Sequence, residues 1–463
     1  MKKVYDDSDL KSIISYAQRL ENKTIDEVNF EQKTYGAILT NHSDSRIVEF
    51  KGKGAFGNYL ETAYFGKKPD NKSQADFSKS NLELKASPLK ILSNYEVKVK
   101  ERLVLNHFTF NDLDKEVFDS SHFKEKNQNI LIVFYFYDKN SSPGKMKVSI
   151  ADLWQCIKED EFQIRQDWQT IVNKIHDGKA HEISEGDTLY LGACTKGVTK
   201  ESSMQVQPHS EVRAAGRAFC FKLGYINHIY QILLQRREHR KEMETRLLGK
   251  NEDFEKKINF LYAPYLKLPI RKIYKMRGKI YNPNNKSRFA QIARDIIGLN
   301  KSETNLYEFN ASGIQVKTIR VEYDGKMTES LSFKTIDFCE IVDEEWEESY
   351  FYSAVTSKFI FVIFKQDSKE GEYFLDRVVF WQIPKSDYDI IKSVWLETRE
   401  KIRQGDYKNF VKIRENRIAH VRPHAKDSRD LSITPQGTFE KKKCFWINQR
   451  YIQENVLNPI YRK

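Results

Sequence analysis

The sequence predicts a mixed α+β protein (class α/β) built from two tandem domains. Three observations support this prediction: the chain has 463 residues, helical and strand periodicities alternate along it, and four segments of the first half recur in order in the second. A chain of this length is too long for one ordinary hydrophobic core and suits two. Hydrophobic residues make up 40% of it, including 29 Phe and 24 Tyr, so each half can bury a core.

The first half opens with two predicted helices. Apolar residues recur at helical spacing from Leu10 to Leu20, which indicates an amphipathic helix. The segment GAFGNYLETAYFG (54–66) predicts a second helix, followed by a polar loop over 67–74. The apolar face expected for the second helix consists of Phe56, Tyr59, Leu60, Ala63 and Tyr64.

Strand periodicity begins at Leu82. Leu82 and Leu84 should point to one face of a strand, and Glu83 and Lys85 to the other. Later segments predict two more strands, the second of them buried on both faces, and then a helix: 100–108, 129–137 and 162–175.

A charged segment separates the two halves. Residues 231–257 are dense in charge and have little apolar periodicity beyond their start, which is typical of a solvated helix or a linker. We therefore place a domain boundary near residue 250, giving domains 1–250 and 251–463. The repeated segments indicate a duplicated fold. They pair 76–86 with 308–318, 100–110 with 328–338, 127–138 with 357–367, and 216–230 with 442–453.

Composition limits the function classes. The chain has 77 Lys and Arg against 65 Asp and Glu, a net charge of +12, which favours a polyanionic partner such as nucleic acid, although basic soluble proteins without one are common. The five cysteines include no Cys-x-x-Cys pair, which argues against a disulfide framework and a cysteine-based zinc site. With no apolar signal segment and no apolar run long enough to span a bilayer, we expect a cytoplasmic protein without a membrane partner.

The stretch ADFSKSNLELKASP (75–88) carries the candidate chemistry. Asp76 is followed seven residues later by Glu83 and then by Lys85. Phosphodiester hydrolysis needs neutralised phosphate charge and an activated water, which Mg²⁺ held by a few carboxylates can supply. Asp76 and Glu83 would be the ligands, and Lys85, on the same strand face as Glu83, could orient the water. By itself the short pattern fits a solvated strand face better than a nuclease site.

The wider context resembles a known family. GAFGNYLE (54–61), ADFSKSNLELKASP (75–88), KERLVLN (100–106) and SSHFKEKNQNILIVFY (120–135) resemble, in order, the MutH family of PD-(D/E)xK endonucleases, which act on 5′-GATC-3′. The resemblance extends through 165–197 and 216–225, and the full length with its second copy is similar to the Sau-type GATC-specific type II restriction endonucleases. It implies two restriction-endonuclease-like domains, each a central mixed sheet flanked by helices.

The resemblance also implies roles for individual residues. Asp76 and Glu83 correspond to the metal carboxylates, and Lys85 to the catalytic lysine. Glu61 corresponds to an acidic residue on the preceding helix, and Lys126 to a basic residue near the scissile phosphate. From the residues alone, Glu61 fits a solvated helix position and Lys126 a strand-edge position equally well.

The segment 191–207 is polar enough to be a base-reading loop in the major groove. Lys196 occupies the position of a DNA-contacting lysine in MutH-like proteins, whereas Cys194 stands where that family has an arginine. Basic loop residues are commonly just solvated. The candidate phosphate contacts are Lys200, Arg213 and Arg217.

The second copy has lost the acidic set. Glu308 aligns with Asp76, Gln315 with Glu83 and Lys317 with Lys85, and Arg294 falls near the position of Glu61. An amide in place of a carboxylate and a nearby cation both oppose Mg²⁺ binding. We therefore expect this copy not to cleave DNA.

The second copy retains basic segments. VRPHA (421–425) resembles the MutH segment that contains the arginine replaced by Cys194, which makes Arg422 and His424 candidate DNA contacts. His420 and His424 are four residues apart, but Pro423 opposes a regular helix between them, so a metal pair is not expected.

The resulting hypothesis is a Mg²⁺-dependent type II restriction endonuclease that cuts double-stranded DNA at GATC, with a C-terminal domain that binds a second DNA site as an allosteric effector. The alternatives are a MutH-like nicking endonuclease of mismatch repair and a non-catalytic DNA-binding regulator. Whether the protein dimerises or bridges two sites on DNA, and which methylation blocks it, stay open.

Overall fold

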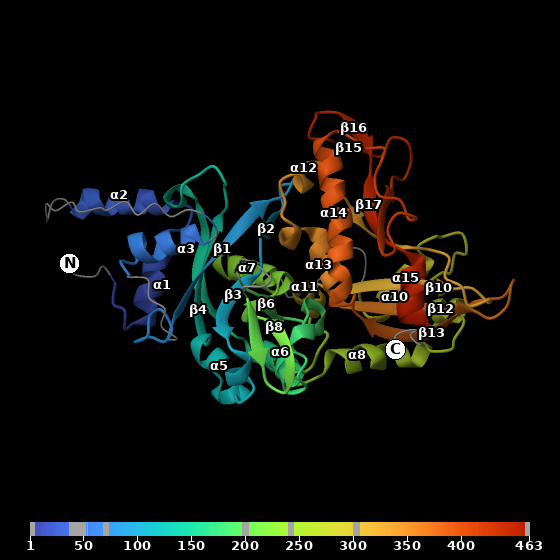
Figure 1. Cartoon of the computed structure of the whole chain (residues 1–463), viewed down its shortest axis with the longest axis horizontal. Coiled ribbons are helices and arrows are strands. Elements are labelled where there is room, and N and C mark those ends of the chain that lie inside the picture. The colour runs from blue at the N-terminus through green and yellow to red at the C-terminus, as the bar shows by residue number, and fades with distance from the viewer. Residues whose placement is uncertain are drawn as a thin grey trace. The chain divides into compact units, whose positions relative to one another are not determined.

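The computed structural model describes residues 5–36, 52, 54–67, 74–196, 203–238, 245–299 and 306–458 (Figure 1). The chain divides into two compact units. The first comprises the described residues of Met1–His181 and Ala193–Glu242, and the second those of Glu182–Gly192 and Met243–Lys463. Within the described ranges, no helix is both long enough and apolar enough to cross a membrane.

The first unit is a mixed α+β assembly, as expected. Its helices are α1 (Leu10–Gln18), α2 (Ile25–Gly36), α3 (Ala55–Tyr59), α4 (Phe110–Leu113), α5 (His122–Lys126), α6 (Lys158–His176) and α7 (Leu223–Arg237). Its strands are β1 (Glu83–Ile91), β2 (Val97–Val99), β3 (Leu103–Phe108), β4 (Asn129–Phe136), β5 (Val148–Gln155), β7 (Met204–Gln207), β8 (Ser210–Ala215) and β9 (Arg217–Phe221). Strand β6 (Leu191–Thr195) begins in the segment assigned to the second unit and ends in the first.

Two sheets organise this unit. One has the order β2-β1-β4-β5, and the other β3-β9-β6. The central pair of the first sheet, β1 and β4, is parallel, with Glu83 opposite Ile130, while the outer pairs are antiparallel. Six consecutive residues of β4 are buried, which confirms the prediction of a strand covered on both faces.

The predicted N-terminal helices are present, with one change of register. Helix α1 begins after Asp9, whose carboxylate accepts a hydrogen bond from Lys11 N. Helix α3 continues as a π-helical turn over Leu60–Tyr64, closed by a bond from Phe65 N to Leu60 O (3.1 Å). The wider turn buries Phe65 and leaves Ala63 exposed, so the prediction that Ala63 belongs to the apolar face was wrong.

The second unit has the same kinds of elements. Its helices are α8 (Phe254–Tyr262), α9 (Ile270–Met276), α10 (Arg288–Ile296), α11 (Tyr307–Ser312), α12 (Phe338–Ile341), α13 (Tyr350–Thr356), α14 (Tyr388–Arg403) and α15 (Gln449–Ile452). Its strands are β10 (Gln315–Val321), β11 (Leu331–Thr335), β12 (Phe359–Gln366), β13 (Tyr373–Trp381), β14 (Ala419–Pro423), β15 (Leu431–Ile433), β16 (Phe439–Lys441) and β17 (Lys443–Ile447).

Sheet topology confirms the duplication. The sheet β10-β12-β13 repeats β1-β4-β5, including the parallel central pair, and β11-β17-β14 repeats β3-β9-β6. Gln315 opens β10 opposite Phe359, as Glu83 opens β1 opposite Ile130. A two-stranded hairpin comes directly before the central strand of the sheet β3-β9-β6 and of its counterpart β11-β17-β14. It is β7–β8 before β9 in the first unit and β15–β16 before β17 in the second.

A buried tyrosine–aspartate pair also occurs in both units. Tyr225 of α7 donates its hydroxyl hydrogen to Asp160 Oδ2 in α6 (2.9 Å), and Tyr451 of α15 donates to Asp387 Oδ2 just before α14 (2.6 Å). Both aspartates are almost completely buried. Because a buried carboxylate is costly without donors, each bond ties a C-terminal helix of its unit to the long helix.

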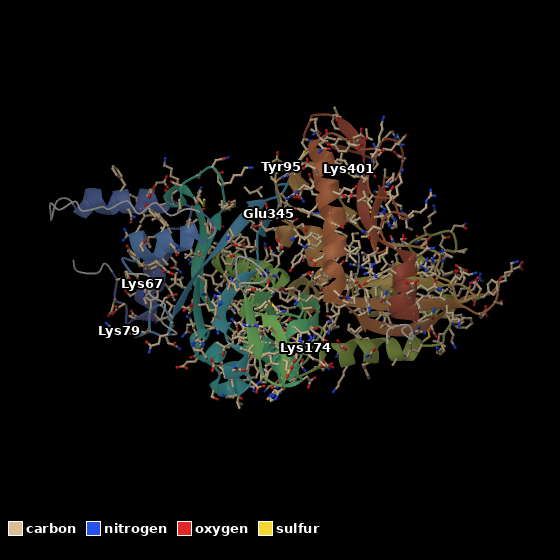
Figure 2. All side chains as sticks on the ribbon, viewed as in Figure 1. Lys67, Lys79, Tyr95, Lys174, Glu345 and Lys401 are labelled. Atoms are coloured by element: carbon tan, nitrogen blue, oxygen red, sulfur yellow. The ribbon has the colours of Figure 1, made fainter. Side chains whose placement is uncertain are left out.

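We therefore expect Tyr451→Phe to lower the free energy of unfolding by about 1 to 3 kcal/mol, because it leaves the buried Asp387 carboxylate short of one donor. Chemical denaturation followed by fluorescence measures this change. Tyr95→Phe is the matched control, because Tyr95 is 89% exposed (Figure 2). Equal effects of the two substitutions would show that the buried bond contributes nothing to stability.

Candidate active site

A tight turn brings Asp76 beside the start of β1. Phe77 and Leu82 form an antiparallel bridge, with hydrogen bonds Phe77 N to Leu82 O (2.9 Å) and Leu82 N to Phe77 O (3.2 Å). Asn81 completes the turn in the left-handed region (φ 48°), which asparagine tolerates better than most residues. Asp76 and Glu83 flank this bridge, so the spacing of seven residues places them opposite each other.

Hydrogen bonds fix the two carboxylates. Leu84 N donates to Asp76 Oδ2 (2.8 Å), and Asp76 N donates to Glu83 Oε2 (3.3 Å). Within the described part of the chain, Asp76 Oδ1 has no hydrogen-bond partner. Two adjacent carboxylates with an oxygen still available are hard donors of the kind that Mg²⁺ prefers, so these residues fit a divalent-ion site.

Two lysines compensate the charge of Glu83, which is only 2% exposed. Lys85 Nζ lies 2.8 Å from Glu83 Oε1 and donates to Leu105 O (3.1 Å). Lys126 Nζ lies 3.6 Å from the same carboxylate oxygen. Lys85 can contact the Glu83 carboxylate because residues two apart on a strand lie on the same face. Lys126 is the last residue of α5.

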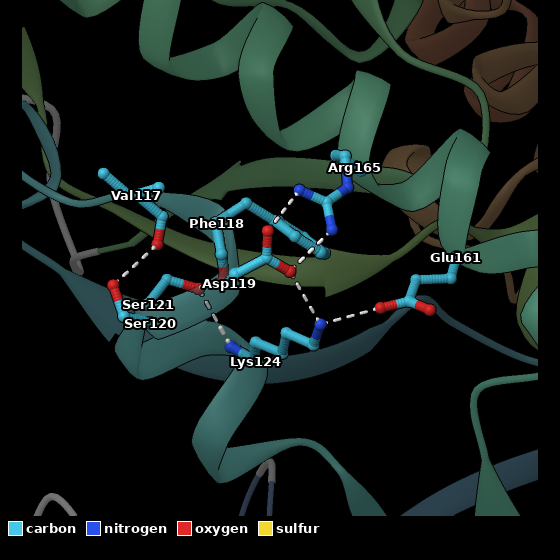
Figure 3. Close-up of polar contacts among 8 residues, drawn as sticks. All are labelled: Val117, Phe118, Asp119, Ser120, Ser121, Lys124, Glu161 and Arg165. Carbon is cyan, nitrogen blue, oxygen red and sulfur yellow. Dashed lines mark hydrogen bonds and ion pairs between the residues drawn. The ribbon is translucent and has the colours of Figure 1, made fainter.

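A surface network fixes α5 and therefore Lys126 (Figure 3). Arg165 of α6 makes two hydrogen bonds to Asp119 (2.7 and 2.6 Å), and Lys124 of α5 bonds the same carboxylate (2.9 Å) and lies 2.8 Å from Glu161. Hydrogen bonds from Arg165 and Lys124 hold the pKa of Asp119 well below its usual range. Ser121 caps α5 by accepting from Lys124 N (3.2 Å).

The acidic groups of the site perturb one another. Burial and the charge of Glu83 raise the pKa of Asp76, although the Leu84 hydrogen bond and the nearby lysines oppose this. Burial and the charge of Asp76 raise the pKa of Glu61, which the π-helical turn after α3 places near the carboxylate pair. A partly buried cluster of like charges is the arrangement that a divalent cation relieves.

One residue of the site was missed by sequence reasoning. Lys67, labelled in Figure 2, donates to the backbone carbonyl of Asp76, and its Nζ lies 4.3 Å from the centre of the Phe77 ring. The segment was predicted as a polar loop, and nothing in its composition distinguishes this lysine from its solvated neighbours. Only the folded turn shows that Lys67 holds the backbone of a candidate metal ligand.

A pocket of about 670 Å³ lies in the same unit and contains two of the predicted DNA-binding residues, Lys196 and Arg217. Asn106 and His107 of β3 also line it, and sequence reasoning singled out neither of them as a site residue. Burial, with smaller contributions from the charges of Lys196, Lys85 and Lys126, lowers the pKa of His107. His107 is therefore close enough to Lys196, Lys85 and Lys126 for their charges to disfavour its protonated form.

The predicted basic residues of the first unit differ in exposure. Arg217 is 4% exposed and donates to the backbone carbonyl of Ala193, so part of its guanidinium joins β9 to β6. Arg213 is exposed and donates to Met204 O (2.9 Å). Lys196 is partly exposed at the end of β6. Lys200 lies outside the described residues.

In the second unit, Glu308, which aligns with Asp76, forms hydrogen bonds with the backbone. Glu308 is 2% exposed and accepts hydrogen bonds from Leu247 N (2.9 Å) and Leu248 N (3.0 Å). Lys317 donates to Ser332 O (2.7 Å), as Lys85 does to Leu105 O, and burial lowers the pKa of Lys317 to about 8. With Gln315 at the position of Glu83, no carboxylate pair forms there.

The predicted DNA contacts of the second unit gather around Trp446. The Arg422 guanidinium lies 3.7 Å from the centre of the Trp446 ring, and the His424 ring packs edge-on at 5.4 Å. Both Arg422 and His424 are exposed. His420 is buried instead, with Nδ1 2.5 Å from Asn448 Oδ1.

Comparison with known proteins assigns the chain to a family. Residues 65–167 and 298–393 both match the family described as the DNA mismatch repair enzyme MutH. The type II restriction enzyme Sau3AI of Staphylococcus aureus is 32% identical over 435 residues, which cover 86% of this chain and 87% of that enzyme. MutH of Vibrio parahaemolyticus is 27% identical over 39% of this chain and 78% of its own length. MutH of Histophilus somni is 28% identical over 32% of this chain and 67% of its own length.

The matches agree with the duplicated topology, because the MutH family matches one segment in each unit and the restriction enzyme matches most of the chain. The protein belongs to the MutH-like family of site-specific deoxyribonucleases, in the branch that includes the type II restriction enzyme Sau3AI.

Proposed function

We propose that this protein is a Mg²⁺-dependent type II restriction endonuclease that hydrolyses both strands of DNA at 5′-GATC-3′. Domain 1–250 would cleave, and domain 251–463 would bind a second DNA site as an effector. The observation that carries the proposal is the pairing of Asp76 with Glu83 beside Lys85 in one copy of a duplicated fold. The GATC sequence follows from the family resemblance.

Asp76 and Glu83 would hold the divalent ion, since their carboxylates meet across the turn before β1. When bound, Mg²⁺ supplies charge neutralisation at the phosphate and activation of the attacking water. Both carboxylates must be ionised to serve as ligands. Lys85 and Lys126 bring two positive charges to the Glu83 carboxylate.

The remaining groups would act on the substrate directly. Lys85, whose Nζ contacts Glu83 and Leu105 O, would orient a water and offset negative charge that develops on the phosphate. Lys126 adds a second positive charge at the same carboxylate. The raised pKa of Glu61 makes it a stronger proton acceptor than a solvated glutamate.

DNA recognition would use the pocket that Lys196 and Arg217 line. Lys196 is partly exposed, so it could contact DNA directly. Arg217 is buried, so it could contact DNA only through those of its atoms that line the pocket. A net charge of +12 supports sequence-independent attraction to the phosphate backbone. These features favour double-stranded DNA as the partner.

The second domain would bind DNA without cutting it. Arg422 and His424 are exposed beside Trp446, while Glu308 is committed to backbone hydrogen bonds. An allosteric role requires two DNA sites and two states of the enzyme, with DNA at the second site favouring the active state. The second copy supplies the candidate site for such an effector.

The decisive test incubates the full chain with Mg²⁺ and unmethylated plasmid that carries several GATC sites. We expect defined double-strand fragments from the native protein and from Gln315→Ala. Asp76→Asn should cleave at least about a hundredfold more slowly, because it removes one of the two charged ligands of the divalent ion, yet still retard DNA in a gel. Gln315→Ala is the matched control, since Gln315 holds the position of Glu83 in the second copy.

Other products would select other functions. Nicked circles without linear product would indicate the MutH-like nicking alternative, and intact plasmid with retarded mobility would indicate a non-catalytic regulator. Full activity of Asp76→Asn would overturn the assignment of the active site.

The raised pKa of Asp76 predicts a specific pH dependence of stability. The pKa of Asp76 in the folded state lies above its ordinary value. Asp76 therefore contributes to stability at pH values below the ordinary pKa, and this contribution is lost as the pH rises through the raised pKa. Asp76→Asn should therefore increase the unfolding free energy of the metal-free protein at neutral pH by on the order of 1 kcal/mol. Its melting temperature should rise accordingly. The difference should shrink as pH falls.

Thermal unfolding over a pH series measures this effect. Mg²⁺ should raise the melting temperature of the native protein at neutral pH and have little effect on Asp76→Asn. A metal-free Asp76→Asn protein that is less stable than the native one at neutral pH would contradict the repulsion that we infer between Asp76 and Glu83.

A further inference from the structure

A second cluster of potential metal ligands lies in the first unit, on elements that hold none of the proposed catalytic residues. Asp114, His176 and His209 each offer one ligand atom, and these atoms all lie within 4.8 Å of one another. Asp114 follows α4, His176 ends α6, and His209 lies in the turn of the β7–β8 hairpin. It is the single such group of three among the residues that the structure describes.

The backbone brings these three residues together. Gly178 lies just beyond α6 with φ +69°, and a Cβ at that position would come within 2.5 Å of His209 O. Only glycine permits so close an approach. His209 itself has φ 58°, in a turn closed by the pairing of Gln207 with Ser210. The tip of the hairpin is thus seated against the end of α6.

The contacts within the cluster leave one carboxylate oxygen of Asp114 without a hydrogen bond. His209 Nε2 lies 3.2 Å from Asp114 Oδ2, and His176 Nδ1 lies 2.8 Å from Asp114 Oδ1. Oδ1 is inaccessible to water, yet it has no hydrogen bond of acceptable geometry. A buried carboxylate oxygen close to a ring nitrogen, but not bonded to it, is an unmet need that a shared cation would satisfy.

The ligand chemistry distinguishes this cluster from the carboxylate pair at β1. Two imidazoles and one carboxylate favour Zn²⁺ or a similar transition-metal ion, whereas Mg²⁺ prefers oxygen donors alone. Ligand atoms around a tetrahedral Zn²⁺ stand about 3.3 Å apart. The three ligand atoms here lie within 4.8 Å of one another, so the side chains would have to draw together by at most about 1.5 Å to bind the ion. His176 and His209 are about half exposed, which leaves the fourth position open to water.

We propose that Asp114, His176 and His209 bind one Zn²⁺-class transition-metal ion, which fastens the β7–β8 hairpin to α6 and α4. The site holds the hairpin, while the carboxylate pair at Asp76 and Glu83 performs the proposed chemistry. The base of the hairpin contributes Met204 and Gln205 to the pocket that contains Lys196. Metal at the tip would therefore limit the motion of one wall of that pocket.

The test uses Co²⁺, whose visible absorption reports tetrahedral nitrogen and oxygen coordination, and Zn²⁺ in competition. All proteins carry Asp76→Asn, which removes the carboxylate site and makes the experiment independent of cleavage. We expect one equivalent of Co²⁺ to bind and to be displaced by Zn²⁺. His176→Gln and His209→Asn should each weaken Zn²⁺ binding at least about tenfold, as expected for loss of a ligand.

The substitutions are chosen to preserve the fold. Asparagine tolerates the left-handed backbone of position 209, and glutamine keeps a polar side chain at the end of α6. His424→Ala is the control, because His424 is exposed in the other unit, and it should bind Zn²⁺ normally. Hydrogen exchange should show slower exchange in the β7–β8 hairpin with Zn²⁺ only when both histidines are present.

Two results would overturn the proposal. One is Zn²⁺ affinity that is unchanged by His176→Gln and His209→Asn. The other is the absence of tetrahedral Co²⁺ absorption together with lower metal-free stability of the same variants, which would show that the three residues form an ion-pair cluster only.

Discussion

The burial of the Glu83 carboxylate is the constraint on which the first unit depends. Removing a carboxylate from water costs several kcal/mol unless charges and hydrogen bonds compensate it. Here the compensation comes from Lys85 on the same strand, Lys126 at the end of α5 and the backbone of Asp76. Strand β1, helix α5 and the turn before β1 must therefore all be in place for the charge to be tolerated. The Asp119–Arg165 network that anchors α5 belongs to the same requirement.

The second unit repeats the strand order β1-β4-β5 as β10-β12-β13, but it has no buried carboxylate at the position of Glu83. Gln315 replaces the buried charge with an amide, and Lys317, which aligns with Lys85, donates a hydrogen bond to Ser332 O. Burial lowers the pKa of Lys317 to about 8. Glu308 accepts hydrogen bonds from two backbone N–H groups. The same strand frame therefore forms with either set of residues, which means that the acidic set of the first unit is not required for folding.

The sequence predicted the features that repeat with a period or match between the copies. Alternation around Leu82 and the apolar run at 129–137 predicted the central strands, and the aligned positions 83 and 315 predicted which copy lost its carboxylate. It did not predict features set by folding over longer distances. The π-helical turn moves Ala63 to the surface, and Lys67 becomes part of the site only through the Phe77–Leu82 turn. Segment Glu182–Gly192 groups with the second unit, where Asp187 accepts a hydrogen bond from Gln382 (2.7 Å), and no local pattern marks that pairing.

The two units also differ in where they leave charge unsatisfied. In the first, burial and like charge raise the pKa values of Asp76 and Glu61, so the metal-free site is electrostatically unfavourable at neutral pH. In the second, the charged groups around Trp446 are exposed and already compatible with solvent. A cation that binds to the carboxylates of the first unit relieves their repulsion. A polyanion can bind the exposed basic groups of the second unit without any change in buried charge. A duplicated fold can in this way divide catalysis and DNA binding, because each copy is free to satisfy a different electrostatic demand.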